Sequence, residues 1–395
     1  MRKIAFFVLM TALALSLHAQ SSTFAEYETE HYRVLSEIGE DHARATAEKL
    51  ESLLELYNEY FHFELGELPV RLRARFFSDE SRYDNYLQRV IETTRDDFVY
   101  LHYTDLAKSE LVGYAMDAEA FDVSLKHQGL IQFLRAFVPN PPLWMREGFA
   151  VYFEEVEFDE SLDRAVYREN LAWLETLQSI VDGSAGVAPI PLSEMLRMNV
   201  DQARDRIEVF YPQAWGMVNF LLNSSNRDYN RIIWDSISAL EPDASLAENS
   251  QNVWDAAFRW EPDEVLIDSF VSYVEDRKSF RTLVQDGIDQ YAGGDLDSAE
   301  ESFVTALKLR EDNFIPYYYM GLINYDRKNY GLADFYYKEA LSRGSAEALT
   351  YYALGVNAYA DNRFDDAESF LEQTVALDPE AYETKATQLL ERIRG

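Results

Sequence analysis

The chain has 395 residues, 47% of them hydrophobic, and a formal net charge of −34 at pH 7. A field of that sign repels phosphate backbones and anionic lipid surfaces, so the composition argues against nucleic-acid binding. The sequence contains no cysteine, which excludes disulfides, a thiol nucleophile and thiolate metal sites. The length and apolar content suggest two or three domains with their own cores.

The N-terminus predicts export. Arg2 and Lys3 precede an apolar stretch at 4–17, and the small residue Ala19 follows it closely. This stretch is too short to cross a hydrocarbon core of about 30 Å, and its order is that of a secretory signal peptide. We therefore expect residues 1–20 to be removed and the mature protein to be periplasmic or secreted. The alternative is an uncleaved N-terminal anchor.

Residues 21–276 read as an α+β domain with a small mixed sheet and several helices. Alternating apolar residues predict strands, and apolar residues at helical spacing predict helices between them. From Trp144 onward the pattern is helical. The expected strands lie at 31–37, 70–77, 98–103 and 111–116, and the expected helices include 41–61 and 118–137.

The stretch 124–155 carries the most informative motif of this domain. It resembles the gluzincin-type zinc peptidases, in particular their peptidase MA-like domains, and the resemblance covers roughly 26–276. The family has H-E-x-x-H on one helix, a proline-rich turn, and a helix beginning P-x-W-L-x-E-G-L-A-x-Y. The residues that match the second helix are Pro142, Trp144, Met145, Glu147, Gly148, Phe149, Ala150 and Tyr152.

The metal motif itself departs from the family. His127 stands at the position of the first zinc-binding histidine, and Glu147 at that of the third ligand. Gln128 replaces the general-base glutamate, and Ile131 replaces the second histidine. A catalytic zinc needs three protein ligands plus a water, and a glutamine amide cannot take a proton from that water. We therefore expect no catalytic residue, no bound zinc and no other cofactor.

Two other interpretations of this domain remain open. One is an active zinc metallopeptidase with a non-standard site, in which His102, Glu119, His127 and Glu147 converge. The other is a structural or assembly module whose former cleft is filled by side chains. The leading prediction is a non-catalytic pseudo-peptidase that acts by binding, with its former substrate cleft available to hold a peptide beside the edge strand of its sheet.

A repeat of 34 residues follows, and it resembles the tetratricopeptide family. The predicted repeats are 280–313, 314–347 and 348–381, and a capping helix completes an all-α solenoid over 280–395. Small residues where paired helices cross keep their axes within the usual 8–10 Å, and the large residue is expected to fill the space between repeats. The recurring residues are Gly287, Gly321 and Gly355; Ala299, Ala333 and Ala367; and Phe303, Tyr337 and Leu371.

The first helices of the repeats are expected to line a concave groove. A tyrosine recurs at each level, and tyrosine combines a large contact area with a polar tip. We therefore predict a protein or peptide partner. The competing interpretation is that these side chains pack against the capping helix or the preceding domain. The groove residues are Val284, Ile288, Tyr291, Tyr318, Leu322, Tyr325, Tyr352, Val356 and Tyr359.

Overall fold

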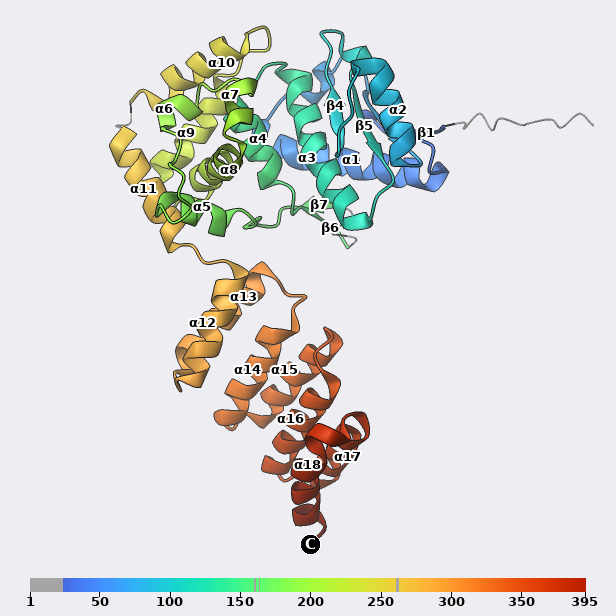
Figure 1. The fold of residues 1–395 in the computed structure, drawn as a ribbon, viewed down its shortest axis with the longest axis vertical. Coiled ribbons are helices and arrows are strands. Elements are labelled where there is room, and N and C mark those ends of the chain that lie inside the picture. The colour runs from blue at the N-terminus through green and yellow to red at the C-terminus, as the bar shows by residue number, and fades with distance from the viewer. Residues whose placement is uncertain (1–23, 160, 163, 261–262) are drawn as a thin grey trace, which may run out of the picture. The chain divides into compact units, whose positions relative to one another are not determined.

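The computed structural model describes residues 24–395 apart from 160, 163, 261 and 262 (Figure 1). The predicted signal peptide, 1–20, lies outside these residues. The chain divides into two compact units, the first ending at Ala136 and the second beginning at Phe137. The predicted domain limit at 276 therefore falls inside the second unit. Within the described part of the chain, no helix has the length and apolar character needed to span a bilayer.

The first unit is built around a five-stranded mixed sheet, which confirms the expected small mixed sheet. Its strand order is β1-β2-β3-β5-β4. The inner strands β2, β3 and β5 run parallel, while the edge strands β1 and β4 are antiparallel to their neighbours. The strands are β1 (Ala25–Glu28), β2 (Tyr32–Ser36), β3 (Leu72–Phe77), β4 (Val99–Leu101) and β5 (Glu110–Tyr114). The helices are α1 (Glu40–Phe61), α2 (Glu80–Ile91) and α3 (Ala118–Phe137).

One face of this sheet packs into the core of the first unit. Successive side chains of a strand point to opposite faces of the sheet. Val34 of β2 and Ala74 and Phe76 of β3 are therefore fully buried, whereas the arginines that neighbour them in sequence are only half-buried. Helices α1 and α3 pack together, with the Tyr57 hydroxyl donating to the carbonyl of Lys126 at 2.9 Å. The alternation of apolar residues in β2 and β3 therefore corresponds to one buried face of the sheet and one half-buried face.

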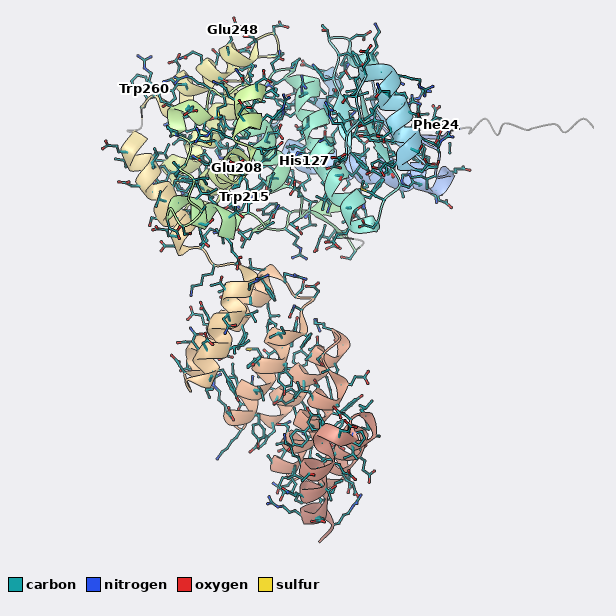
Figure 2. The ribbon with its side chains drawn as sticks, viewed as in Figure 1. Phe24, His127, Glu208, Trp215, Glu248 and Trp260 are labelled. Atoms are coloured by element: carbon teal, nitrogen blue, oxygen red, sulfur yellow. The ribbon has the colours of Figure 1, made fainter. Side chains whose placement is uncertain are left out.

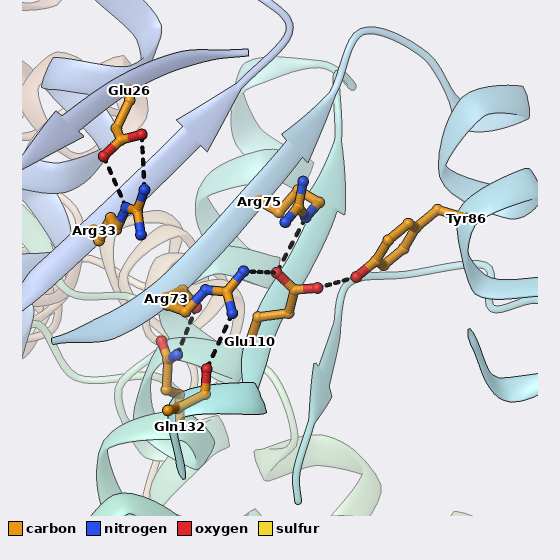
Figure 3. A network of polar contacts seen from close by, with 8 residues as sticks. Glu26, Arg33, Arg73, Arg75, Tyr86, Glu110 and Gln132 are labelled. Atoms are coloured by element: carbon orange, nitrogen blue, oxygen red, sulfur yellow. Dashed lines mark hydrogen bonds and ion pairs between the residues drawn. The ribbon is translucent and has the colours of Figure 1, made fainter. Parts of the chain in front are cut away.

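The other face of the sheet holds a polar network around Glu110, which is only 4% exposed (Figure 3). Its carboxylate accepts a hydrogen bond from Arg75 Nε at 3.1 Å, lies 3.5 Å from Arg73 Nη2, and accepts another bond from the Tyr86 hydroxyl. The Arg75 guanidinium also lies over the ring of Phe24, 5.0 Å from its centroid. These arginines therefore compensate a buried carboxylate.

The second unit begins with helices and a small hairpin, β6 (Glu157–Asp159) and β7 (Arg164–Val166). Helix α4 packs tightly on α8, since a Cβ added at Gly148 would lie 2.5 Å from the carbonyl oxygen of Ala214. Trp215 on α8 is 1% exposed, whereas Trp260 is 77% exposed (Figure 2). The helices are α4 (Leu143–Tyr152), α5 (Leu174–Val181), α6 (Leu192–Met195), α7 (Val200–Asp205), α8 (Ile207–Asn223), α9 (Arg227–Ser238), α10 (Leu246–Val253) and α11 (Asp263–Asp276).

Three helix pairs and a final helix complete the second unit, as the 34-residue period predicts. The turn inside each pair places a left-handed residue at the same repeat position: Gly294, Lys328 and Asn362. The pairs are α12 (Phe280–Ala292) with α13 (Leu296–Leu309), α14 (Phe314–Asp326) with α15 (Tyr330–Ser342), and α16 (Glu347–Ala360) with α17 (Phe364–Leu377). The final helix is α18 (Pro379–Arg394).

The large residue of each repeat packs in two directions. Phe303 of α13 lies against Gly287 of its own pair, where an added Cβ would come within 2.7 Å of Phe303 Cζ. Its ring also stacks on Tyr319 of the next pair at 5.2 Å. Phe303 therefore fills the space between repeats, as expected, and also explains why its own first helix needs glycine.

Candidate functional site

Helix α3 carries the segment in which the sequence predicts a degenerate metal motif, and Gln128 has a structural partner there. Its Oε1 accepts a hydrogen bond from the backbone N–H of Tyr100 on the edge strand β4, at 3.1 Å. One turn later, Gln132 Nε2 donates to the carbonyl of Arg73 on β3, at 2.8 Å. Ile131 is 8% exposed. Gln128, predicted to stand at the general-base position, thus ties helix α3 to the edge strand β4.

His127 is a half-buried residue of α3 (Figure 2). Glu119, offered above as an additional ligand, is exposed at the start of the same helix. Eight residues separate the two, which is about 12 Å along the helix axis, so their side chains do not converge on one ion. His102 follows β4 in the same unit, and its ring lies 5.8 Å from that of Tyr100. Within the described residues, no three histidine or carboxylate side chains group as metal ligands would.

Glu147 lies on α4 in the second unit and is 6% exposed. Its Oε1 accepts a hydrogen bond from Arg146 Nε at 2.7 Å, and its Oε2 accepts one from the Tyr211 hydroxyl at 3.2 Å. Burial and the neighbouring Glu147 carboxylate raise the pKa of Tyr211, so this phenol stays protonated and continues to donate. The Glu147 carboxylate, predicted to stand at the third-ligand position, is therefore bonded to an arginine and a tyrosine.

The predicted groove residues lie on the first helices of the repeats, and most of them are half-buried. We call the half-buried members the tyrosine face. Val284 differs, since it is 8% exposed and packs with Leu283 and Ala306. The tyrosine face consists of Ile288 and Tyr291 on α12, Tyr318, Leu322 and Tyr325 on α14, and Tyr352, Val356 and Tyr359 on α16.

The tyrosines of adjacent repeats lie close enough to influence one another. Burial and the nearby phenols of Tyr382 and Tyr319 raise the pKa of Tyr318 to about 12. Burial and the nearby groups of Tyr330, Asp326 and Tyr352 raise the pKa of Tyr325. The phenols of Tyr318 and Tyr325 therefore remain neutral and able to donate hydrogen bonds at neutral pH.

Two residues at this surface were not predicted from the sequence. Asp326 ends α14 and accepts a hydrogen bond from the Tyr291 hydroxyl at 2.9 Å. Tyr382 belongs to α18, and its ring lies 5.3 Å from that of Tyr352. The final helix therefore covers one end of the tyrosine face, as the competing interpretation expected for part of it. Continuing the 34-residue period by one copy would have placed α18 in the row of first helices.

Comparison with known proteins finds similarity only to solved structures. No family model matches the chain, and no curated protein sequence matches it. Solved structures that resemble it include the first TPR domain of Spaghetti (RPAP3) bound to the HSP90 peptide SRMEEVD, at 18% identity and a TM-score of 0.27. That match covers 29% of this chain and 90% of the other.

Two further solved structures show the same level of similarity. The Arabidopsis OM64 TPR domain has 17% identity and a TM-score of 0.28 over 29% of this chain and 93% of its own. MamA residues 41 to the end from Desulfovibrio magneticus RS-1 has 22% identity and a TM-score of 0.26 over 36% and 90%. The helix pairs described above define the fold of residues 280–395, and the expected resemblance of residues 26–276 to zinc peptidases stays a prediction from the sequence motif.

Proposed function

We propose that this chain is an exported, non-catalytic scaffold that binds a protein partner through a tetratricopeptide-type array. The observation that carries the proposal is the tyrosine face, a row of half-buried phenols on successive first helices. Tyrosine is enriched at protein interfaces because it buries a large area and keeps a polar tip. Arrays of helix pairs present such extended surfaces to their partners.

The α+β part is proposed to be a degenerate zinc-peptidase-type domain that no longer hydrolyses peptides. Gln128 and Glu147 support this, because each has a partner that gives it a structural role. With the outer N–H of Tyr100 already bonded to Gln128, strand addition at β4 would have to break an existing hydrogen bond. We therefore place partner binding on the repeats rather than at the edge of the sheet.

Site-specific photo-crosslinking tests the binding surface. A photoreactive benzoylphenylalanine is introduced at Tyr325 of the tyrosine face, or at Phe335 as the matched control, since Phe335 is an aromatic residue of α15 that is 52% exposed. Irradiation of producing cells is expected to give a discrete adduct from position 325 only. Adducts of equal yield from both positions, or from the control alone, would contradict the assignment.

Metal analysis tests the pseudo-peptidase part of the proposal. The purified protein is expected to hold no stoichiometric zinc and to leave a casein substrate intact. One zinc per chain that disappears with His127→Ala, together with chelator-sensitive proteolysis abolished by Glu147→Ala, would establish the metallopeptidase alternative instead.

A further inference from the structure

We propose that the tyrosine face selects a positively charged segment of its partner, with lysine or arginine side chains lying against the tyrosine rings and Asp326 as their counter-charge. This inference rests on the proposed function and adds the chemistry of the ligand. It follows from the charge of the first helices, from the rings they present, and from what those rings already contact.

The first helices carry almost no positive charge. Helices α14 and α16 contain no lysine or arginine, and α12 has only Arg281 in its first turn. The single charged residue of α14 is Asp326, which is exposed and held in place by the Tyr291 hydroxyl. Residues 280–395 as a whole contain 11 Lys and Arg against 21 Asp and Glu, a net charge of −10. An acidic peptide would therefore be repelled, and a basic one attracted from a distance.

The rings themselves favour a cation. Lysine and arginine bind over the face of an aromatic ring, and such contacts strengthen when they are partly desolvated. The chain already makes this contact elsewhere in its repeats: the Arg343 guanidinium lies 4.0 Å from the ring centroid of Tyr317. Along the tyrosine face, no lysine or arginine in the described part of the chain covers Tyr291, Tyr318 or Tyr325. Lys385 lies over Tyr382 at the α18 end of the row, 6.0 Å from its centroid.

The apolar members of the tyrosine face add a second requirement. Leu322 lies one helical turn after Tyr318, and Val356 lies one helical turn after Tyr352. A segment that is only basic would leave these groups uncovered, so the partner should alternate cationic and aliphatic side chains. Binding should weaken as salt is added, because the charges at this surface are partly exposed and are screened.

A pair of peptides tests the inference on the full-length mature protein. A fluorescent peptide containing lysines among leucines and glutamines is compared with its twin in which every lysine is glutamate, by fluorescence anisotropy at low and high salt. The lysine peptide is expected to bind at least about tenfold more tightly, which corresponds to about 1.4 kcal/mol. The difference should shrink at high salt.

Variants locate the binding. Asp326→Asn is expected to weaken binding of the lysine peptide about twofold to fivefold, a range typical of one exposed charge contact. The matched control, Asp365→Asn on the exposed surface of α17, should leave binding unchanged. Tyr325→Leu should weaken binding to a similar extent, whereas Tyr325→Phe keeps the ring and should retain it. Circular dichroism checks that each variant is folded.

The outcomes separate this inference from the proposed function. If the glutamate twin binds equally well and Tyr325→Leu weakens both peptides, the preference for positive charge is wrong while the tyrosine face remains the binding surface. If the lysine peptide binds but ignores Asp326→Asn and Tyr325→Leu, the charge-selective site is not on this face. Absence of binding by the lysine peptide also overturns the inference, and the crosslinking experiment then decides the proposed function by itself.

Discussion

The side-chain oxygen of Gln128 accepts a hydrogen bond from the backbone N–H of Tyr100 at 3.1 Å. Under the proposed zinc-peptidase relationship, Gln128 stands at the general-base position, and Tyr100 lies in the edge strand of the sheet. An edge strand presents backbone groups to any chain that can pair with them. A glutamine that bonds one of these groups therefore has a structural role without any metal chemistry.

Removing the amide of Gln128 should destabilise the first unit. Gln128→Ala leaves the Tyr100 N–H without this acceptor, and a typical cost is about 1 kcal/mol. Gln128→Glu retains an acceptor oxygen and should change stability less. Urea unfolding followed by circular dichroism measures both variants. Gln373→Ala on α17, which loses only an exposed contact to Ser369, serves as the control. A Gln128→Ala variant as stable as the control would show that the bond contributes nothing.

Replacing Glu147 should have a larger effect. Glu147→Ala removes a buried carboxylate from Arg146 and Tyr211, and the uncompensated arginine makes a loss of about 3 kcal/mol the expected result. Tyr211→Phe removes one hydrogen bond and should cost about 1 kcal/mol. A double-mutant cycle in urea measures the coupling between the two sites. Additive losses would show that the bond between the phenol and the carboxylate does not stabilise the protein.

The repeat glycines should resist enlargement. Gly287→Ala forces a Cβ to within 2.7 Å of Phe303 Cζ, in a fully buried ring, and overpacking of this kind costs about 1–3 kcal/mol. The control is Gly331→Ala in α15, where an added Cβ meets nothing within 4 Å and the higher helix propensity of alanine should stabilise by up to about 1 kcal/mol. Thermal unfolding compares the two. A melting temperature raised equally by both changes would refute the tight crossing.

The protein should lose stability at alkaline pH. Burial raises the pKa of both Tyr86 and Tyr318 to about 12 in the folded protein. In the unfolded chain, a tyrosine has a pKa of about 10. Below pH 10 both states hold the proton, so stability is unaffected. Between about pH 10 and 12 the unfolded state releases protons that the folded state retains, so the free energy of unfolding falls.

Tyrosinate absorbance measures this difference directly. In strong denaturant all 26 tyrosines should titrate as one transition near pH 10, whereas the native protein should show a delayed fraction. The variant Tyr318→Phe should reduce that fraction. Coincident native and denatured titrations would mean that these phenols are not buried as described.

The sequence by itself determined the elements that depend on short-range pattern. Alternating residues identified β2 and β3 of the first unit, because only one face of a sheet can be buried without polar cost. The edge strand β1 (Ala25–Glu28) was not predicted. The 34-residue spacing of Gly287, Gly321 and Gly355 identified the helix pairs, because a pair of crossing helices needs a small residue at the same point in every copy.

Tertiary structure alone decided which groups meet across long stretches of chain. The pairing of Gln128 with Tyr100 spans 28 residues, and that of Glu147 with Tyr211 spans 64. Neither pairing leaves a periodic signal, because each depends on how helices and strands pack rather than on spacing within one element. For the same reason, only the bond from the Tyr291 hydroxyl to Asp326 showed that an anion lies beside the tyrosine face.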